Sequence, residues 1–255
     1  MPTPSVLLER RDAMLLITIN RPHVKNAVDL SVARGLADAF DTLESDPRLG
    51  IAILTGADNT FCAGMDLKAF GEGRPPVTGN GGFAGITRRP PTKPVIAAVE
   101  GYALAGGCEI ALVCDLIVAA RNAHFGLPEV RRGLVAAAGG LVRLPRRIPR
   151  QIAMEYALTG ALLPATRAYE VGLVNRLVEP AESLAAAIDL ASSIVANAPL
   201  AVRATKRIIK EGLDDTEDGA FALQESISAP VMASSDAREG AAAFVEKRQP
   251  VWQAL

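Results

Sequence analysis

Two glutamates set in glycine- and proline-containing turns are the side chains of this sequence best suited to acid–base chemistry. Glu109 directly follows the sequence Gly106-Gly107-Cys108, and Glu129 directly follows Pro128. Two carboxylates that face one water can act as base and acid, because one removes a proton while the other supplies one. Each glutamate also has a simpler interpretation. The helix dipole favours an acid such as Glu109 in a first helical turn, and Glu129 could be an ordinary acid of a surface loop.

The backbone beside Glu109 could hold a negatively charged oxygen. Residues 96–115 are predicted to form a short strand, a glycine turn at Ala105-Gly106-Gly107 and a helix, because the apolar residues after the turn recur at helical spacing. N–H groups at the start of a helix lack partners within it, and the dipole there favours negative charge. Such a turn can also serve only to pack a helix on a strand. A second glycine turn, Ala63-Gly64, and the second glutamate favour a functional site.

The composition predicts an ordinary globular protein. Of 255 residues 49% are apolar and 22% charged, the net charge is −1, and a chain of this length can bury a sizeable core. The near-neutral charge argues against a nucleic-acid partner, and no apolar run approaches the ~18–20 residues of a membrane span. Three cysteines without a CxxC pair, only two histidines and no secretion signal predict a reduced, cytoplasmic protein without a metal site.

Apolar runs alternate with helical patterns over the first part of the chain. Buried strands are predicted at residues 13–20, 51–54, 94–99 and 116–120, and a helix is predicted at residues 26–44. The first strand ends where Arg21-Pro22 follows it, because proline disfavours continued regular pairing. This alternation is typical of an α/β protein.

The later part of the chain divides into a loop and a helical region. Residues 71–87 are rich in glycine and proline and are predicted to be a surface loop without a regular element, either a lid over a site or an inert insertion. From residue 139 the sequence becomes predominantly helical, and Asp236 and Glu239 resemble a capping box of the last helix. We therefore predict a core of residues 1–195 that carries the site and a helical oligomerisation region of residues 196–255.

Several motifs, in order along almost the whole chain, resemble those of the enoyl-CoA hydratase/isomerase (crotonase) superfamily. They are Thr18-Ile19-Asn20-Arg21-Pro22, Asn26-Ala27, Leu54-Thr55-Gly56, Phe61-Cys62-Ala63-Gly64-Met65-Asp66-Leu67, Gly106-Gly107-Cys108-Glu109, Pro128-Glu129 and Glu246-Lys247-Arg248. The resemblance implies a spiral of ββα units with a C-terminal helical region used in trimerisation. It also implies a homotrimer or dimer of trimers that binds acyl-CoA thioesters, with coenzyme A as part of the substrate and no other cofactor.

The resemblance implies a role for each site residue. The backbone N–H groups of Met65 and Gly106 would form an oxyanion hole, Glu109 would handle the water, and Glu129 would supply the proton at C2. The residues implied to line the path of the CoA adenine and pantetheine, or to contact substrate, are Lys25, Ala27, Ala63, Asp66, Leu67 and Pro128. Lys247 would reach a CoA phosphate, either within its own protomer or across a subunit boundary. The alternative interpretation is a solvated helix lysine.

One segment departs from the pattern of the classical hydratases. Residues 135–140 read Val-Ala-Ala-Ala-Gly-Gly. At the same place the classical hydratases have a sequence similar to Ile-Pro-Gly-Ala-Gly-Gly. The loss of the proline and of the first glycine alters the wall near the water and the acyl chain. Leu127-Pro128-Glu129 and residues 141–149 also look similar to the carnitinyl-CoA dehydratase branch, so the acyl group and the direction of reaction stay open.

The predicted function is therefore a 2-enoyl-CoA hydratase of the lyase class, with a place in fatty acid metabolism, or the reverse dehydratase. An enoyl-CoA isomerase, which can work with one carboxylate, is one alternative, and a carnitinyl-CoA dehydratase-like lyase is another. A non-catalytic acyl-CoA or RNA binding module is a third, although both glutamates argue against it. A dinucleotide-dependent oxidoreductase is disfavoured, because no GxGxxG motif follows the first strand.

Overall fold

The chain forms an α/β structure around a largely parallel sheet. The structure is a computed structural model, and it describes residues 3–253. Within these residues a six-stranded sheet has the order β1-β2-β3-β6-β8-β11. Its strands are Val6–Arg11, Met14–Ile19, Ile51–Gly56, Val95–Val99, Leu116–Ala120 and Arg176–Val178. Only β1 is antiparallel to its neighbour, and β2 onward pair in parallel. The predicted α/β class is confirmed.

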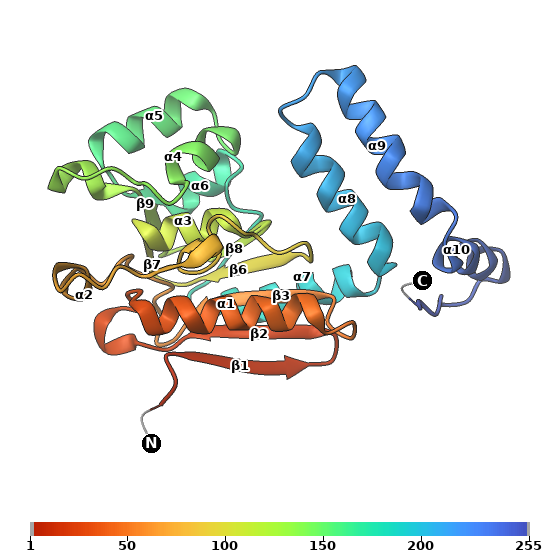
Figure 1. The fold of residues 1–255 in the computed structure, drawn as a ribbon, viewed down its shortest axis with the longest axis horizontal. Coiled ribbons are helices and arrows are strands. Elements are labelled where there is room, and N and C mark those ends of the chain that lie inside the picture. Colours follow the sequence, from red (N-terminus) through yellow and green to blue (C-terminus); the bar gives the residue numbers. More distant parts are fainter. Residues whose placement is uncertain (1–2, 254–255) are drawn as a thin grey trace.

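Both faces of this sheet are buried. Along β2, Leu15 and Ile17 belong to one apolar cluster and Met14 and Leu16 to another, because successive side chains point to opposite faces. One face packs on α1 (Leu30–Ser45) and α3 (Gly106–Val113), and the other packs on α7 (Ser183–Val195). Figure 1 shows α1 and α7 on either side of the central strands. A sheet covered on both faces explains why its strands read as continuous apolar runs.

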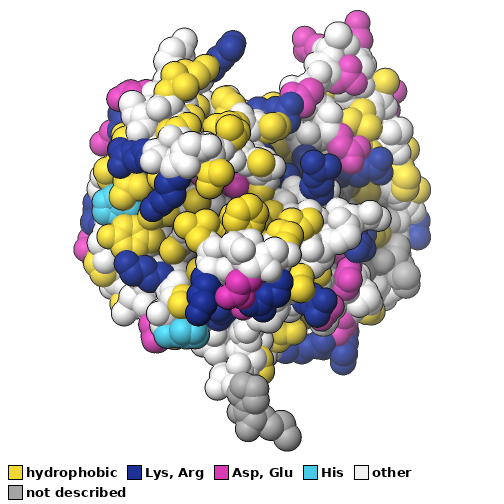
Figure 2. Space-filling model, turned by 60° about the vertical axis from the view of Figure 1, so that its left-hand side comes forward, with side chains coloured by type: hydrophobic (Ala, Val, Ile, Leu, Met, Phe, Trp, Pro, Cys, Tyr) yellow, Lys and Arg dark blue, Asp and Glu magenta, His cyan; other side chains and the backbone are white. Residues whose placement is uncertain are grey.

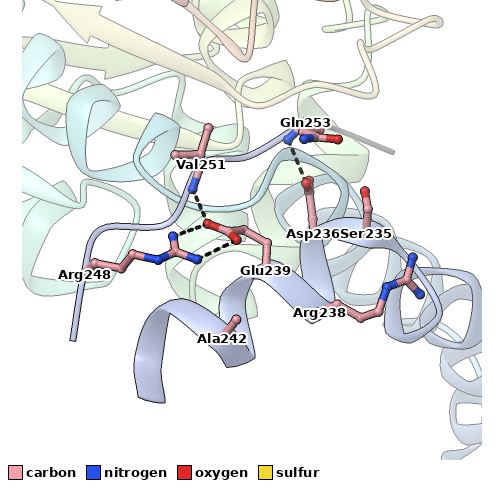
Figure 3. Close-up of a pocket in the computed structure, with 8 residues that line it drawn as sticks. All are labelled: Ser235, Asp236, Arg238, Glu239, Ala242, Arg248, Val251 and Gln253. Carbon is pink, nitrogen blue, oxygen red and sulfur yellow. Dashed lines mark hydrogen bonds and ion pairs between the residues drawn. The ribbon is translucent and has the colours of Figure 1, made fainter. Parts of the chain in front are cut away.

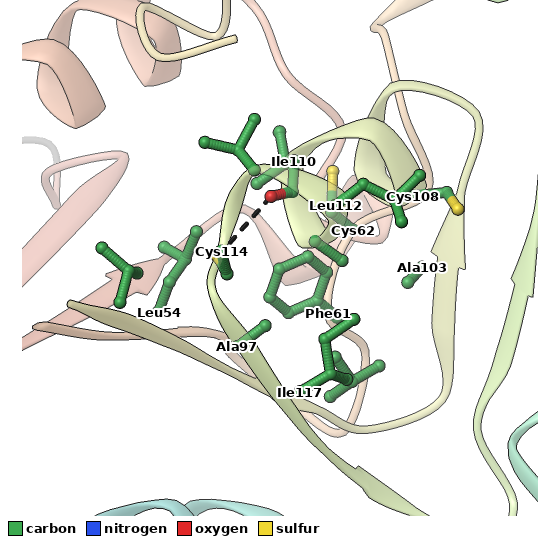
Figure 4. Close-up of a cluster of buried hydrophobic side chains, with 14 of the residues drawn as sticks. Leu54, Phe61, Cys62, Ala97, Ala103, Cys108, Ile110, Leu112, Cys114 and Ile117 are labelled. Carbon is green, nitrogen blue, oxygen red and sulfur yellow. Dashed lines mark hydrogen bonds between the residues drawn. The ribbon is translucent and has the colours of Figure 1, made fainter. Parts of the chain in front are cut away.

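A smaller sheet lies beyond α3. It contains β7 (Tyr102–Leu104), β9 (His124–Gly126) and β10 (Leu163–Pro164) in the order β10-β9-β7. Figure 4 shows apolar side chains of α3 packed with Phe61, Ala97 and Ile117 in one continuous core. Cys62, Cys108 and Cys114 are all free and buried there. Helix α3 is therefore fixed by packing on its sides, which leaves its N-terminus to be placed by β7.

The glycine-rich segment after Met65 is only partly irregular. It begins with α2 (Leu67–Gly71) and then forms β4 (Val77–Thr78), the 3₁₀ turn η2 (Gly79–Gly81) and β5 (Gly82–Phe83), with β4 and β5 paired in antiparallel. The prediction that residues 71–87 hold no regular element is therefore wrong. The two strands have two residues each, which is too short for an alternating sequence pattern to reveal.

The predominantly helical region contains short helices beside the site and long helices at the C-terminus. The short elements are η3 (Pro128–Arg132), α4 (Gly140–Arg143), η4 (Leu144–Arg146), α5 (Arg150–Thr159) and α6 (Ala165–Glu170), and the long ones are α8 (Pro199–Gly212), α9 (Glu217–Met232) and α10 (Ser235–Glu246). Figure 1 shows α8 and α9 as an antiparallel pair beside the core, with α10 following α9 near the start of α8. Lys206 of α8 pairs with Asp115 at 2.6 Å, and Arg146 pairs with Asp214 at 2.9 Å, so two ion pairs connect this arm to the core.

Two predicted helix starts are wrong. Helix α1 begins at Leu30 and not at residue 26, because the Asp29 side chain caps it by accepting the N–H of Val32. The last helix is capped by Ser234, whose hydroxyl accepts the N–H of Ala237, so Asp236 and Glu239 lie inside the helix and do not form its capping box.

No single helix of residues 3–253 is both long and apolar enough to cross a membrane. Only α7 and α8 together pass by length and composition, with a bend of 108° between them.

Candidate active site

The turn before α3 holds the backbone of Gly106 in place. Ala105 precedes it with a φ of +51°, a conformation that side chains rarely adopt, and its N–H donates to the Gly126 carbonyl of β9 at 2.8 Å. Gly107 packs so closely that a Cβ there would lie 2.1 Å from the Cys62 oxygen. The glycine pair is therefore required by close contact with the neighbouring segment, as well as by the turn.

A second backbone segment passes directly beside this turn. Residues 61–66 pair on one side with β7, where Cys62 bridges Ala103, and on the other side with Val28, which bridges Met65. A Cβ on Gly64 would lie 3.3 Å from the nitrogen of Gly106, so the two turns are in contact. The site is thus assembled from segments about forty residues apart by strand-like pairing.

The N–H groups of Met65 and Gly106 are the predicted oxyanion donors. Met65 does not use its N–H in the bridge to Val28, because that bridge is made by the N–H groups of Val28 and Asp66. Within residues 3–253 neither Met65 nor Gly106 donates a backbone hydrogen bond to another residue. Two neighbouring N–H groups without a partner in the chain can donate hydrogen bonds to an oxyanion.

Glu109 is buried and held by a turn of the chain. Its Oε1 accepts the N–H groups of Ala138 at 2.7 Å and Gly140 at 2.9 Å, and only 3% of the residue is exposed. Burial raises the pKa of Glu109, the Glu129 charge raises it further, and the two N–H groups oppose this shift. The pKa of Glu109 is raised overall. One oxygen is therefore fixed by the backbone, which leaves the other oxygen to act on a ligand.

Glu129 lies in the first turn of η3, directly after Pro128. Its Oε2 is buried and has no hydrogen-bond partner among the residues that the structure describes. Burial raises the pKa of Glu129, and the residue's own backbone N–H and the charge of Arg132 only partly oppose this shift. An unpartnered buried carboxyl oxygen costs free energy unless it is protonated or meets a ligand. Glu129 therefore has the properties of a proton donor. The charge of Glu129 raises the pKa of Glu109, so protonation of Glu129 favours the ionised form of Glu109.

Phe83 of β5 closes one side of the Gly106 turn. A Cβ built on Gly106 would lie 2.4 Å from the tip of the Phe83 ring, so the ring occupies the space where any larger residue would place its side chain. Phe83 is half-buried and packs against the apolar core. No motif or periodic pattern in residues 71–87 marks Phe83 as a site residue.

The predicted CoA-contacting residues differ in what they contact. The carbonyl of Lys25 accepts the N–H of Ala63 at 3.0 Å, and its ammonium lies 5.6 Å from the centre of the Tyr102 ring. Ala27 is half-buried and Leu67 is exposed, and the Ala27 carbonyl accepts from Arg21 at 2.7 Å. The structure therefore places Lys25 in contact with Ala63, and the contact of these residues with CoA stays a prediction.

Asp66 has structural partners that the sequence did not reveal. Its carboxylate pairs with Arg21 at 3.1 Å and caps α2 by accepting the N–H groups of Lys68 and Ala69. Burial raises the pKa of Asp66, but these hydrogen bonds and the Arg21 charge outweigh it and lower the pKa overall. Asp66 therefore stays ionised and holds α2 in position beside Met65.

Lys247 is not brought to the other predicted residues within one protomer. It follows the end of α10, which Figure 1 shows at the opposite end of the molecule from α2. A surface pocket of about 500 Å³ lies along α10 (Figure 3), where Glu239 pairs with Arg248 at 2.6 Å. None of the predicted site residues lines this pocket. Among the described residues no group of three or more His, Cys, Asp or Glu side chains could hold a metal ion.

Comparison with known proteins places this geometry in a known context. The chain matches the family model described as enoyl-CoA hydratase/isomerase over residues 9–254. It is 42% identical to the enoyl-CoA hydratase EchA19 of Mycobacterium tuberculosis, over 98% of this chain and 97% of that protein. It is also 42% identical to the carnitinyl-CoA dehydratase of Salmonella enteritidis, with 98% of each chain covered. A crystal structure of an enoyl-CoA hydratase from Mycobacterium tuberculosis H37Rv is 61% identical and matches with a TM-score of 0.97, over 99% of this chain and 100% of that one.

Proposed function

We propose a reaction for this chain, which belongs to the enoyl-CoA hydratase/isomerase family and has the crotonase fold. The chain adds water across the 2,3 double bond of a 2-enoyl-CoA thioester, or removes water from the 3-hydroxyacyl-CoA in the reverse direction. The observation that carries this proposal is the presence of Glu109 and Glu129 beside two backbone N–H groups without a partner in the described chain. A hydratase needs both features, an acid–base pair and a holder for the enolate oxygen.

The backbone donors explain how the thioester is activated. When hydroxide adds to C3, the electron pair of the double bond moves toward the carbonyl and places negative charge on the thioester oxygen. The N–H groups of Met65 and Gly106 would hold that oxygen, and each such donor contributes on the order of 3 kcal/mol to transition-state stabilisation. These donors belong to the backbone, so a methionine at position 65 leaves the function intact.

The glutamates explain the fate of the protons. Glu109 would take one proton from the water as its oxygen bonds to C3, while the N–H groups of Ala138 and Gly140 keep the carboxylate in place. Glu129 would then donate a proton to C2 as the enolate collapses, and the raised pKa of Glu129 supports its being protonated before that step. Exchange of protons with solvent returns both residues to their starting states.

Assay of a series of 2-enoyl-CoA thioesters tests this function. Loss of the absorbance of the conjugated enoyl thioester is expected with at least one chain length, and the preferred length ranks the substrates. Faster conversion of a 3-enoyl thioester would instead identify an isomerase. CoA affinity without turnover would identify a binding module. Because of the similarity to carnitinyl-CoA dehydratase, a carnitinyl-CoA substrate tests dehydration as the second candidate.

We further propose a homotrimer, or a dimer of trimers, assembled through the C-terminal helices. The support is a set of large apolar side chains that α9 and α10 leave exposed, including Phe244 at 85%, Val245 at 79% and Met232 at 77%. In such an assembly Lys247 would approach the CoA of a neighbouring protomer. Light scattering after gel filtration is expected to give three or six chains. Phe244→Asp is expected to reduce that number, and Leu8→Asp, on the edge strand β1, is expected to leave it unchanged.

The surface of the protein and its cysteines support a substrate class and a cellular location. Figure 2 shows a face with hydrophobic side chains across its middle and Lys and Arg side chains around them, which suits a ligand that is partly apolar and partly phosphorylated. We propose acyl-CoA as that ligand, without a further cofactor, and a role in fatty acid β-oxidation. The buried, unpaired cysteines support a cytoplasmic location, which fractionation of cells would test.

A further inference from the structure

We infer that Arg143 is a positioning residue that joins the segment of residues 82–88, which carries Phe83, to the turn that orients Glu109. This inference rests on the proposed function for its catalytic consequence, and it stands on contacts that are independent of that function. Arg143 is the last residue of α4, and its side chain is half-buried. Its guanidinium donates to two backbone carbonyls that belong to different parts of the site.

One arm of the guanidinium holds the turn of residues 138–140. Nη1 donates to the carbonyl of Ala138 at 3.2 Å, and the N–H of the same residue donates to Glu109 at 2.7 Å. Ala138 is therefore held on one side by Arg143 and holds Glu109 on the other. The planar guanidinium suits this task, because it presents several donors in a fixed geometry that a lysine lacks.

The guanidinium lies directly against the turn, where only a residue without a side chain fits. Gly139 has a φ of +104°, and a Cβ there would lie 2.1 Å from Nη1 of Arg143. Gly140 is equally restricted on the other side, where a Cβ would lie 2.9 Å from Cγ of Glu109. The two glycines therefore allow Arg143 and Glu109 to approach the same turn from opposite sides.

The other arm reaches the glycine-rich segment. Nη2 donates to the carbonyl of Thr87 at 2.5 Å, and Thr87 is buried with 3% exposure. The N–H of Thr87 donates to the carbonyl of Phe83 at 3.3 Å, and Phe83 places its ring against Gly106. A displacement of Phe83 by an acyl chain would thus reach Glu109 through Thr87, Arg143 and Ala138. The same guanidinium therefore joins the segment that carries Phe83 to the turn that holds the Glu109 carboxylate.

The charge of Arg143 also acts on Glu109. Arg143 lowers the pKa of Glu109, whereas burial and Glu129 raise it. Burial and the neighbouring cations Arg147 and Arg146 lower the pKa of Arg143 itself, but a guanidinium stays charged at neutral pH. Removal of Arg143 is therefore expected to shift the acid limb of the pH–rate profile to higher pH, because Glu109 must lose its proton to act as base.

The test compares Arg143→Met and Arg143→Lys with Arg146→Met as a matched control. Arg146 lies three residues away, is about half exposed and pairs with Asp214. Hydrogen exchange followed by mass spectrometry reports on residues 135–142 and 82–88. We expect faster exchange of both segments in Arg143→Met, a smaller effect in Arg143→Lys, and no change in Arg146→Met. Unchanged exchange of both segments in Arg143→Met would overturn the inference, as would a change of only one segment.

The catalytic readout separates this inference from the proposed function. With an active wild type, Arg143→Met is expected to lower kcat on the order of 100-fold with KM nearly unchanged, and millimolar methylguanidinium is expected to restore part of the activity in Arg143→Ala. A general loss of fold would not be rescued in this way. An inactive wild type would overturn the hydratase function, and hydrogen exchange would still decide whether Arg143 joins the two segments.

Discussion

The Gly140 N–H donates to the Glu109 carboxylate at 2.9 Å, in a turn where a side chain on Gly140 would meet Cγ of that same glutamate at 2.9 Å. The glycine is therefore needed for contact, since its backbone conformation is open to any residue. Replacement by alanine would keep the helix start but push the carboxylate from its position. A displacement of the carboxylate by about 1 Å is enough to disturb the alignment of water with C3.

Gly140→Ala is accordingly expected to lower kcat on the order of 100-fold with a small change in KM, because the residues proposed to contact CoA lie elsewhere in the chain. Steady-state kinetics with a 2-enoyl-CoA measures this change. Gly71→Ala, where no atom lies within 4 Å of the added Cβ, serves as the control and is expected to retain activity. Full activity in Gly140→Ala would show that Glu109 does not depend on this turn.

The contact between Gly106 and Phe83 predicts that Gly106→Ala destabilises the protein and that removal of the Phe83 ring restores stability. Gly106→Ala would place Cβ 2.4 Å from the ring of Phe83, so the ring or the turn must move. We expect a loss of both activity and thermal stability. The double variant Gly106→Ala with Phe83→Ala is expected to recover stability, because the colliding ring is gone. A double variant no more stable than Gly106→Ala would exclude the ring contact as the cause.

The raised pKa of Glu129 predicts that this residue costs stability at neutral pH. The folded state holds the proton more tightly than the unfolded chain, so the cost is complete above the raised pKa and disappears below the ordinary value of about 4.3. Glu129→Gln is therefore expected to increase the free energy of unfolding near pH 7, with an advantage that shrinks toward pH 4. Urea unfolding at several pH values measures it. An advantage that grows as pH falls would contradict the pKa direction.

The ion pair between Lys206 and Asp115 predicts the strength of the connection between α8 and the core. Lys206 donates to Asp115 at 2.6 Å and to the carbonyl of Lys93 at 2.8 Å, and its side chain is 11% exposed. Lys206→Met is expected to lower the free energy of unfolding by about 1.5–3 kcal/mol, because a partly buried carboxylate loses its partner. Urea unfolding at fixed protein concentration tests this value. Arg207→Met, at an exposed pair, is the control and is expected to change stability little.

The sequence was sufficient to predict the elements that bury apolar residues on both sides. Strands β2, β3, β6 and β8 read as apolar runs because both faces of the sheet are covered, and the turn before α3 was marked by its glycines. Strand β1 was missed, because it lies at the edge and most of its residues are exposed. Its polar side chains hide the strand pattern that a buried strand would show.

Long-range contacts explain why part of the candidate site was not predicted. Glu109 and Glu129 stood out because local turns and the family motifs marked them. Arg143 donates to a carbonyl 56 residues earlier, and Phe83 reaches Gly106 from a segment without periodicity. A single sequence carries no signal for such pairs. Their positions depend on how β5 and α4 pack around α3.

The most direct test of the central claim is product analysis by mass spectrometry after reaction in ¹⁸O-labelled water. Wild-type protein with a 2-enoyl-CoA is expected to give the 3-hydroxyacyl-CoA with heavy oxygen at C3. Glu109→Gln and Glu129→Gln are each expected to form this product about 10²- to 10⁴-fold more slowly while they still bind CoA. Unchanged rates in both variants, or a wild-type product without the heavy oxygen, would contradict the assignment of these two glutamates to hydration.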